Sequence, residues 1–249
     1  MARHLRLIRL ANAFVAFALA LLPPASPASA ECGDAGAWPP PFRLVFEATA
    51  TRSVLWITGE SDLVLTRDGD GYVLVSETNA AGFYHARQSS RGLIAAGALV
   101  PIEYTEQRGR RPQETAKFDW RERRVRFSAV AEPVETRPRM QDRLSLLLEL
   151  GRLLKLRPAA SFVEVPVAGV RHASVYRFER RGTETLDLPA GRYDAVKLER
   201  PADAPGNDRH DRLEVWLAPA LCWLPVRVRY ADDRGMTIDQ QLKAAHLAR

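Results

Sequence analysis

The stretch VWLAPALCWLPVRVRY, residues 215–230, sets two apolar segments on either side of a short connection that contains a cysteine. In the second segment, Arg227 and Arg229 alternate with apolar residues, which is the period-two pattern of a strand with one buried face. Pro219 and Pro225 stand at the two ends of the connection, where a missing backbone N–H costs least. The stretch therefore predicts an antiparallel β-hairpin.

The same alternation recurs along most of the chain, and turn-forming residues at 68–71, 109–112, 189–191 and 232–235 separate the runs. The pattern predicts a mainly β fold with an antiparallel, strongly curved sheet or a partly open β-barrel. Strands are expected near residues 42–51, 53–67, 71–79, 83–91, 98–108, 114–120, 124–130, 162–168, 172–188, 192–200, 211–217, 224–232 and 236–243.

Residues 142–156 lie between the strands expected at 124–130 and 162–168 and read DRLSLLLELGRLLKL. This segment is rich in leucine and does not show the period-two pattern. The leucines fall nearly all round a 3.6-residue wheel, so the segment predicts a helix that is covered on most sides. Asp142 is expected to cap its start and Pro158 to end it. We expect this leucine-rich helix to lie against the concave face of the curved sheet.

Residues 1–30 are predicted to be a signal peptide. A basic start with three arginines is followed by an apolar run at 10–22, and small residues lead up to an expected cleavage site near Ala30. The apolar run is too short to span a bilayer, which needs about twenty residues. The sequence therefore predicts export to the periplasm as a soluble protein, with residues 31–249 forming a single β-rich domain that has no membrane span.

The charge pattern does not suggest a nucleic-acid partner. The three arginines of the predicted leader supply half of the formal net charge of +6, and acidic residues are interspersed among the remaining basic ones. A nucleic-acid-binding domain usually concentrates its basic residues in a patch or stripe. We therefore expect no nucleic acid among the partners.

Cys32 and Cys222 are the two cysteines of the chain. Glu31 argues against lipidation of Cys32, because a small residue should precede a lipidated cysteine. In an oxidising compartment two cysteines tend to pair, so the sequence predicts a disulfide between Cys32 and Cys222. The alternative leaves Cys32 as a free thiol in a terminal tail and Cys222 as a small residue in the hairpin connection.

Several short motifs contain residue types that occur in chemical sites. Residues 68–71, DGDG, resemble the start of a calcium loop, but later ligands are missing and a glycine-rich hairpin turn explains them. Residues 208–211, DRHD, could contribute to a metal site, although no second cluster accompanies them and a solvated loop is the simpler interpretation. His172 and Ser174 share one strand face without an identifiable acidic third member. We therefore assign no catalytic, cofactor-binding or metal-binding residue and expect no cofactor.

An ordered set of short segments resembles the bacterial envelope family called domain of unknown function 3108. Asp142 and Ser145 match the start of the family's helical segment, and Ala220 departs from its pattern, which usually has an acidic residue there. The resemblance implies exported β-rich proteins with a partly open barrel, similar to carriers of lipoproteins across the periplasm, and it implies no activity or catalytic residue. The matching segments include DGY at 70–72, LPAGRY at 188–193, VKL at 196–198, WLAP at 216–219, LPVRV at 224–228 and GMTIDQQL at 235–242.

Three hypotheses about function follow. The first is a non-enzymatic protein that binds an apolar or amphipathic envelope ligand, such as a lipid, or an envelope protein partner, in the concavity of the sheet. The second is a hydrolase of envelope polymers that uses paired carboxylates on the concave face. The third is a purely structural or assembly protein of the envelope. Aromatic residues spread over many strands leave room for the first, although most of them are expected to pack in the core.

Overall fold

The computed structural model describes Cys32 and residues 38–81, 84–95, 97–204, 207 and 210–248. The signal peptide predicted for residues 1–30 lies outside the described residues. No helix in the described part of the chain is both long enough and apolar enough to cross a membrane.

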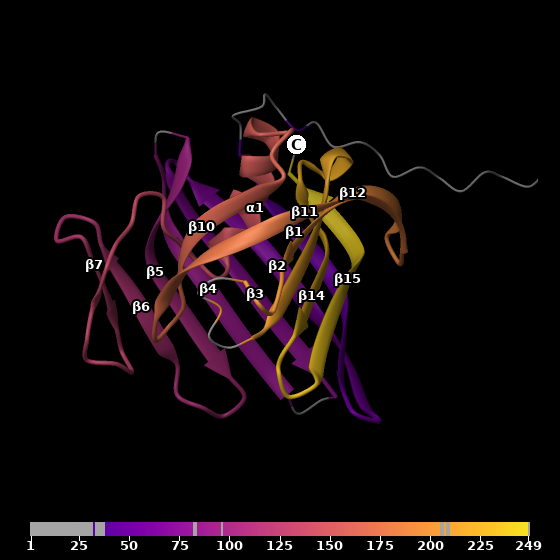
Figure 1. Cartoon of the computed structure of the whole chain (residues 1–249), viewed down its shortest axis with the longest axis horizontal. Helices are drawn as coiled ribbons and strands as arrows, with labels where there is room; N and C mark the ends of the chain where they lie inside the picture. The colour runs from indigo at the N-terminus through magenta and orange to yellow at the C-terminus, as the bar shows by residue number, and fades with distance from the viewer. Residues whose placement is uncertain are drawn as a thin grey trace, which may run out of the picture.

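The described residues form one fifteen-stranded sheet, one α-helix and a short 3₁₀ helix (Figure 1). The α-helix is α1, Ser145–Leu156, and the 3₁₀ helix is η1, Pro219–Leu221. The strands are β1 Phe42–Arg52, β2 Leu55–Asp68, β3 Gly71–Ala80, β4 Tyr84–Ala95, β5 Ala98–Arg108, β6 Glu114–Asp119, β7 Arg124–Phe127, β8 Val134–Glu135, β9 Gln141–Asp142, β10 Phe162–Ala168, β11 Ala173–Leu188, β12 Gly191–Arg200, β13 Arg212–Ala218, β14 Leu224–Ala231 and β15 Met236–Leu247.

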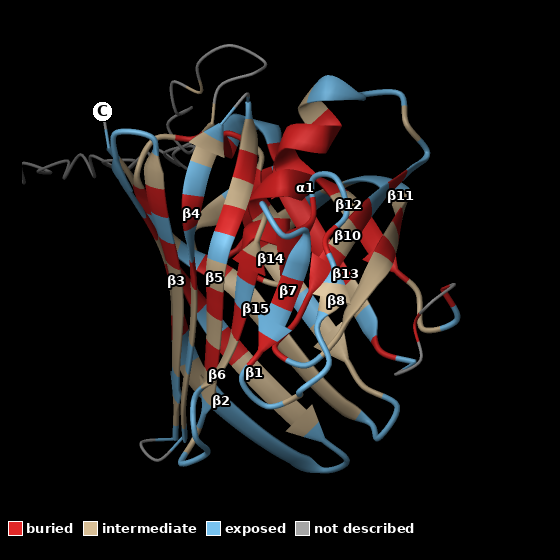
Figure 2. Cartoon of the chain, turned by 90° about the vertical axis from the view of Figure 1, so that its left-hand side faces the viewer, coloured by how far each residue is buried: buried red, intermediate tan, exposed pale blue. Residues whose placement is uncertain are grey.

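The sheet consists of two meanders that join where β1 pairs with β15. The strand order is β8-β7-β6-β5-β4-β3-β2-β1-β15-β14-β13-β12-β11-β10-β9, and the neighbours are antiparallel except for the parallel pair β9–β10. The sheet curls into a barrel-like wall with α1 inside one end (Figures 1 and 2). Its two edge strands, β8 and β9, are not paired with each other, so the barrel is open. The predicted fold class is confirmed.

The predicted hairpin at residues 215–230 is confirmed. β13 and β14 pair antiparallel, and η1 with the left-handed residues Cys222 and Trp223 forms the connection. The connection packs closely on α1, because a Cβ added to Gly151 would lie 2.4 Å from the backbone oxygen of Trp223. The helix can approach the hairpin this closely only because residue 151 has no side chain.

α1 begins three residues later than the sequence predicted. The Asp142 carboxylate does accept hydrogen bonds at this end of the helix, from the backbone N–H groups of Leu144 and Ser145, each at 2.8 Å. In return, the hydroxyl of Ser145 accepts the N–H of Asp142 at 3.0 Å. Asp142 therefore fixes the turn that leads into the helix, and Ser145 is the first helical residue.

The helix is covered on most sides, as the leucine pattern predicted. Leu146 and Leu150 pack in one cluster with Leu198, Val215 and Leu217 of the sheet. Leu148 belongs to a second cluster that includes buried residues of β1 to β3, of β5 to β7 and of the hairpin connection. α1 thus plugs one end of the barrel and defines the inner face of the sheet as the face it contacts.

The predicted pairing of the two cysteines is present in the structure. Cys32 and Cys222 form a disulfide with a Cα–Cα distance of 4.9 Å across a sequence separation of 190 residues. Cys32 and Trp38 pack against the main hydrophobic cluster. The disulfide therefore attaches the segment before β1 to the hairpin connection beside α1.

Candidate functional site

The inner face of the barrel is filled near α1 and open at the opposite end. On β1, the inward residues near α1 are buried, namely Phe42, Leu44, Phe46 and Ala48. Ala50 and Arg52, further along the same face, are not buried. On β2, Leu63 and Leu65 are buried, whereas Ile57 on the same face is exposed. Figure 2 shows this change, since the strands are mostly red beside α1 and turn tan and blue toward their other ends.

We call the uncovered part of this face the open half. Its members follow from the register of β1 to β4 and β13 to β15, which places them on the same face as buried residues next to α1. They mix apolar side chains with hydroxyl and amide groups. The open half consists of Ala50, Ile57, Gly59, Ser76, Thr78, Ala80, Ala86, Gln88, Leu213, Val228, Tyr230, Met236, Ile238 and Gln240.

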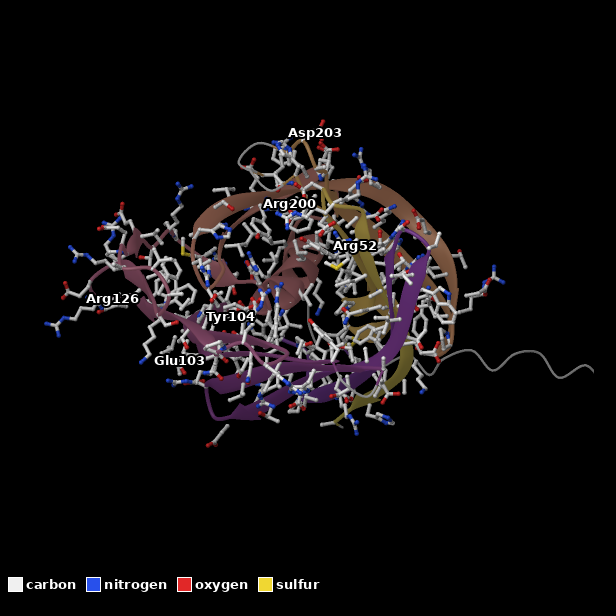
Figure 3. The ribbon with its side chains drawn as sticks, turned by 90° about the horizontal axis from the view of Figure 1, so that it is seen from below. Arg52, Glu103, Tyr104, Arg126, Arg200 and Asp203 are labelled. Carbon is white, nitrogen blue, oxygen red and sulfur yellow. A yellow bond between two sulfur atoms is a disulfide. The ribbon has the colours of Figure 1, made fainter. Side chains whose placement is uncertain are left out.

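The open half is bordered by a charged wall on the inner face of β5 and β6. Glu106 and Glu114 lie opposite each other in the register of these strands. The carboxylate of Glu106 contacts Arg108 and Arg143 and accepts a hydrogen bond from the hydroxyl of Tyr104 at 3.1 Å. Figure 3, seen from below, shows Tyr104 on the wall of the ring that faces Arg200.

Glu114 is held in the same way, by both guanidinium nitrogens that Arg171 directs at it. The pKa of the Glu114 carboxyl is lowered, mainly by the hydrogen bonds from Arg171. Arg143 and Arg171 come from segments next to β9 and β10, at the far edge of the sheet. These two carboxylates therefore connect the two meanders. We call the line along which β9 faces β4 and β5 without strand pairing the seam of the barrel.

A buried polar cluster reinforces the seam closer to α1. Asp142 is fully buried, and the hydroxyl of Ser90 donates a 2.5 Å hydrogen bond to its second carboxylate oxygen. Ser90 also lies 3.0 Å from the hydroxyl of Tyr72, and the amide of Gln141 donates to the backbone oxygen of Leu99 at 3.1 Å. Burial raises the pKa of Asp142, and burial together with the nearby Asp142 charge raises that of Tyr72. Side chains, rather than a strand ladder, thus hold β9 against β4 and β5.

The described residues among those considered as metal sites do not form a ligand cluster. Asp68 to Gly71 form the tight turn between β2 and β3, with Gly69 at a positive φ of 54°, in agreement with the hairpin interpretation. Asp208 and Arg209 lie outside the described residues, while Asp211 pairs with the buried Arg200. No group of three or more metal-ligating side chains occurs in the described part of the chain.

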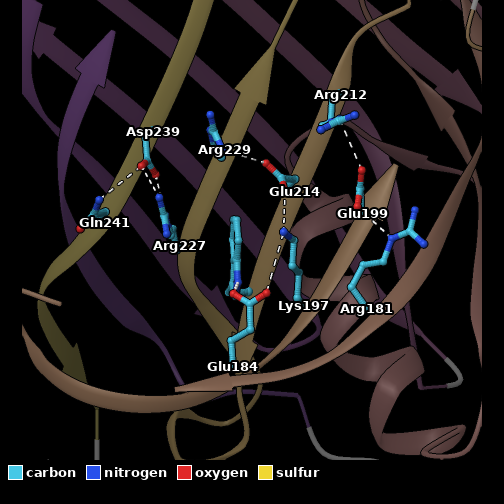
Figure 4. Close-up of polar contacts among 11 residues, drawn as sticks. Arg181, Glu184, Lys197, Glu199, Arg212, Glu214, Arg227, Arg229, Asp239 and Gln241 are labelled. Atoms are coloured by element: carbon cyan, nitrogen blue, oxygen red, sulfur yellow. Dashed lines mark hydrogen bonds and ion pairs between the residues drawn. The ribbon is translucent and has the colours of Figure 1, made fainter. Parts of the chain in front are cut away.

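A network on the outer face, which the sequence analysis did not identify, surrounds Trp216 (Figure 4). Its indole N–H donates to Glu184 at 2.7 Å, and the charged ends of Lys197 and Arg227 each lie 4.8 Å from the ring centroid. Arg227 also makes two hydrogen bonds to Asp239, at 2.9 and 2.6 Å. The network fastens β11 and β12 over the outside of β13 to β15, which gives it a structural role.

The fold and the seam define a class of protein. It has a single curved, mostly antiparallel sheet that forms a partly open barrel, side-chain contacts between the edges of the sheet, and a helical plug. Within this class, the chain belongs to the family described as protein of unknown function (DUF3108), whose sequence model matches residues 46–241. The resemblance noted in the sequence is thereby confirmed. No curated protein matches the chain.

Comparison with solved structures finds similarities at low sequence identity, and the first of those below shares the fold. A β-barrel-like protein of domain of unknown function DUF1849 from Brucella abortus is 10% identical, with a TM-score of 0.55 over 86% of this chain and 100% of that one. A putative outer membrane lipoprotein-sorting protein domain from Vibrio parahaemolyticus is 11% identical, with a TM-score of 0.25 over 84% and 85% of the two chains. A DUF1329 family protein from Desulfovibrio piger is 10% identical, with a TM-score of 0.28 over 84% and 86%.

Proposed function

We propose that this protein is exported to the periplasm and binds an amphipathic envelope molecule in the open half of its barrel, without catalysing a reaction on it. The observation that carries the proposal is the incomplete burial of the inner face. Leu213 lies on the same face of β13 as the buried Val215, and Ile238 lies on the same face of β15 as the buried Leu242, yet both remain partly exposed.

Apolar side chains on a concave surface favour a bound apolar group. Complete burial of a side chain of the size of Ile, Leu or Met contributes about 1.5–3 kcal/mol, so a ligand that covers several of them gains substantial affinity. Hydroxyl and amide groups from Ser76, Thr78, Gln88 and Gln240 stand among them and can orient a polar headgroup. This mixture suits a molecule that has both an apolar and a polar part.

The proposed location rests on the leader-like residues 1–30 and on the disulfide. Disulfides persist in oxidising compartments such as the periplasm and are rare in the cytosol. The proposal itself depends on the residues of this chain.

The hydrolase hypothesis receives less support from the inner-face carboxylates. Glu106 and Glu114 are each paired with arginine. The hydrogen bonds from Arg171 also lower the pKa of the Glu114 carboxyl, which disfavours a role for Glu114 as a general acid. Their partners also connect the two edges of the barrel, which explains these residues structurally. The open half is therefore the stronger basis for a function.

Native mass spectrometry with lipid extraction, on protein purified from a periplasmic fraction, tests the proposal. We expect copurifying amphipathic molecules with the wild type and their loss with Ser76→Phe, which fills the open half. Val75→Phe, on the opposite face of the same strand, is the matched control and should retain them. An empty wild-type protein, or equal occupancy of both variants, would contradict the proposal, and a captured polypeptide would replace the ligand by a protein partner.

A further inference from the structure

The tip of the β1–β2 hairpin carries an exposed apolar cluster. Val54, Leu55 and Trp56 are 88%, 72% and 68% exposed, and Ile57 follows them in the sequence. Ser53, with a positive φ of 55°, makes the tight turn that projects this tip from the sheet. Consecutive large apolar side chains at such exposure are unfavourable in water and indicate an interaction surface.

The tip stands at the rim of the open half, at the end of the barrel opposite α1 (Figure 1). Arg52 and Ala50 lead from the inner face of β1 into the turn, and Ile57 leads back onto the inner face of β2. The neighbouring β3–β4 turn adds Tyr84, which is also exposed. The apolar surface at the rim is therefore continuous with the lining of the barrel.

Positive charge accompanies the apolar tip on this side of the rim. The β5–β6 turn, which lies at the same end of the sheet, reads RGRRPQ at 108–113, and its three arginines are exposed. The three turns at 52–55, 80–84 and 108–113 contain no acidic residue in the sequence. The β14–β15 turn lies on the other side of the tip, because Met236 pairs with Arg52, and it carries Asp232 and Asp233. The excess of positive charge is therefore on the side of the tip that leads to β5 and β6.

We propose that the β1–β2 and β5–β6 turns, together with Tyr84, dock on the anionic surface of a lipid bilayer, with the 54–56 tip inserted among the headgroups. Apolar side chains that penetrate the interface and arginines that attract anionic lipids are the two contributions that stable peripheral binding requires. Tryptophan favours this interfacial depth because its ring is apolar and its N–H is polar. A bilayer rather than a protein groove fits a projecting apolar tip that has a group of exposed arginines on one side.

The docked orientation points the open half at the membrane, so that an amphipathic molecule could pass between bilayer and barrel without crossing water. That consequence rests on the proposed ligand function, whereas the docking itself does not. The two are tested separately, because ligand content is measured on the purified protein and docking is measured with added vesicles.

Cosedimentation with vesicles of phosphatidylglycerol and phosphatidylcholine tests the docking, with pure phosphatidylcholine vesicles for comparison. We expect the wild type to bind the anionic vesicles and the Leu55→Glu variant to bind at least about tenfold more weakly, the loss expected when one leucine-sized group no longer leaves water. The double variant Arg110→Glu/Arg111→Glu should also bind the anionic vesicles more weakly than the wild type, by about fivefold for each arginine lost. Leu93→Glu, a matched change at an exposed apolar residue near the other end of β4, should leave binding unchanged.

Tryptophan fluorescence supplies a second readout. Trp56 should shift to shorter wavelength when anionic vesicles are added, and Trp56→Phe should keep binding while losing the shift. Circular dichroism of each variant shows that the fold is retained. Equal binding of the wild type and Leu55→Glu would overturn the proposal, as would a Trp56 shift that depends on protein concentration alone, since that result would identify a second copy of the chain as the partner.

Discussion

The hydroxyl of Ser90 on β4 donates a hydrogen bond to the buried carboxylate of Asp142 on β9, across a seam at which the sheet has no strand pairing. The same carboxylate accepts the backbone N–H groups of Leu144 and Ser145. One aspartate therefore joins the seam of the barrel to the start of its helical plug.

The Asp142→Asn variant tests this carboxylate through the pH dependence of stability. Burial raises the pKa of Asp142 in the folded protein above its unfolded value of about 4. The folded state therefore binds the proton more tightly, and the contribution of this group to stability is lost as pH rises through the folded pKa. We expect the free energy of unfolding of the wild type to fall relative to that of the variant from about pH 4 upward, as measured by urea unfolding. A difference that does not change with pH would contradict a raised pKa.

The disulfide is expected to form in the exported protein and to contribute to stability. Closing a loop of about 190 residues restricts the unfolded chain by up to ~5 kcal/mol in the chain-entropy model. Thiol titration of the unfolded, unreduced protein should detect no free thiol, and Cys32→Ser/Cys222→Ser should unfold at lower denaturant concentration. Two free thiols per chain would refute the pairing.

Gly151→Ala should destabilise the protein although alanine favours helices by about 1 kcal/mol over glycine. The added Cβ would lie 2.4 Å from the backbone oxygen of Trp223, so α1 must move away from the hairpin connection. We expect a net loss of about 1–3 kcal/mol, typical of overpacking. Leu156→Ala, at the exposed end of the same helix, is the control and should change stability much less. A stabilised Gly151→Ala variant would show that the helix is free to shift.

Arg227→Lys and Arg229→Lys form a matched pair on the outer face of β14. Arg227 binds Asp239 through two nitrogens and lies over the ring of Trp216, a geometry that lysine cannot reproduce. Arg229 makes a single contact with Glu214, at 3.6 Å. Thermal unfolding should show a loss of about 1 kcal/mol for the first substitution and almost none for the second. Equal effects would show that charge alone matters at both positions.

The strands could be predicted from the sequence because period-two alternation depends on local pattern alone. Two strands were missed, Val134–Glu135 and Gln141–Asp142, and each is too short to display a period. The Asp142 carboxylate was expected to cap the helix, but its hydrogen bond to Ser90 joins residues 52 positions apart, which only the curvature of the sheet brings together.

The open half could not be predicted for a related reason. Alternation shows that Ile57 and Ile238 share a face with core residues, but it does not show whether another side chain covers them. Covering depends on the length of α1, whose twelve residues fill one end of the barrel alone. Trp56 likewise has the composition of a core residue and becomes exposed because the hairpin extends beyond the rest of the core.

The pairing of β1 with β15 also sets the order in which the molecule can fold. Most other strand pairs are local hairpins, which close short loops and form quickly, whereas β1 must wait for a partner that places Phe42 opposite Leu247. Because synthesis starts at the N-terminus, the backbone groups of β1 at the edge of the first meander stay unpaired until β15 has been made. Cys32 and Cys222 bridge a loop of similar length, so their oxidation before that moment would bring the two meanders together and shorten the search.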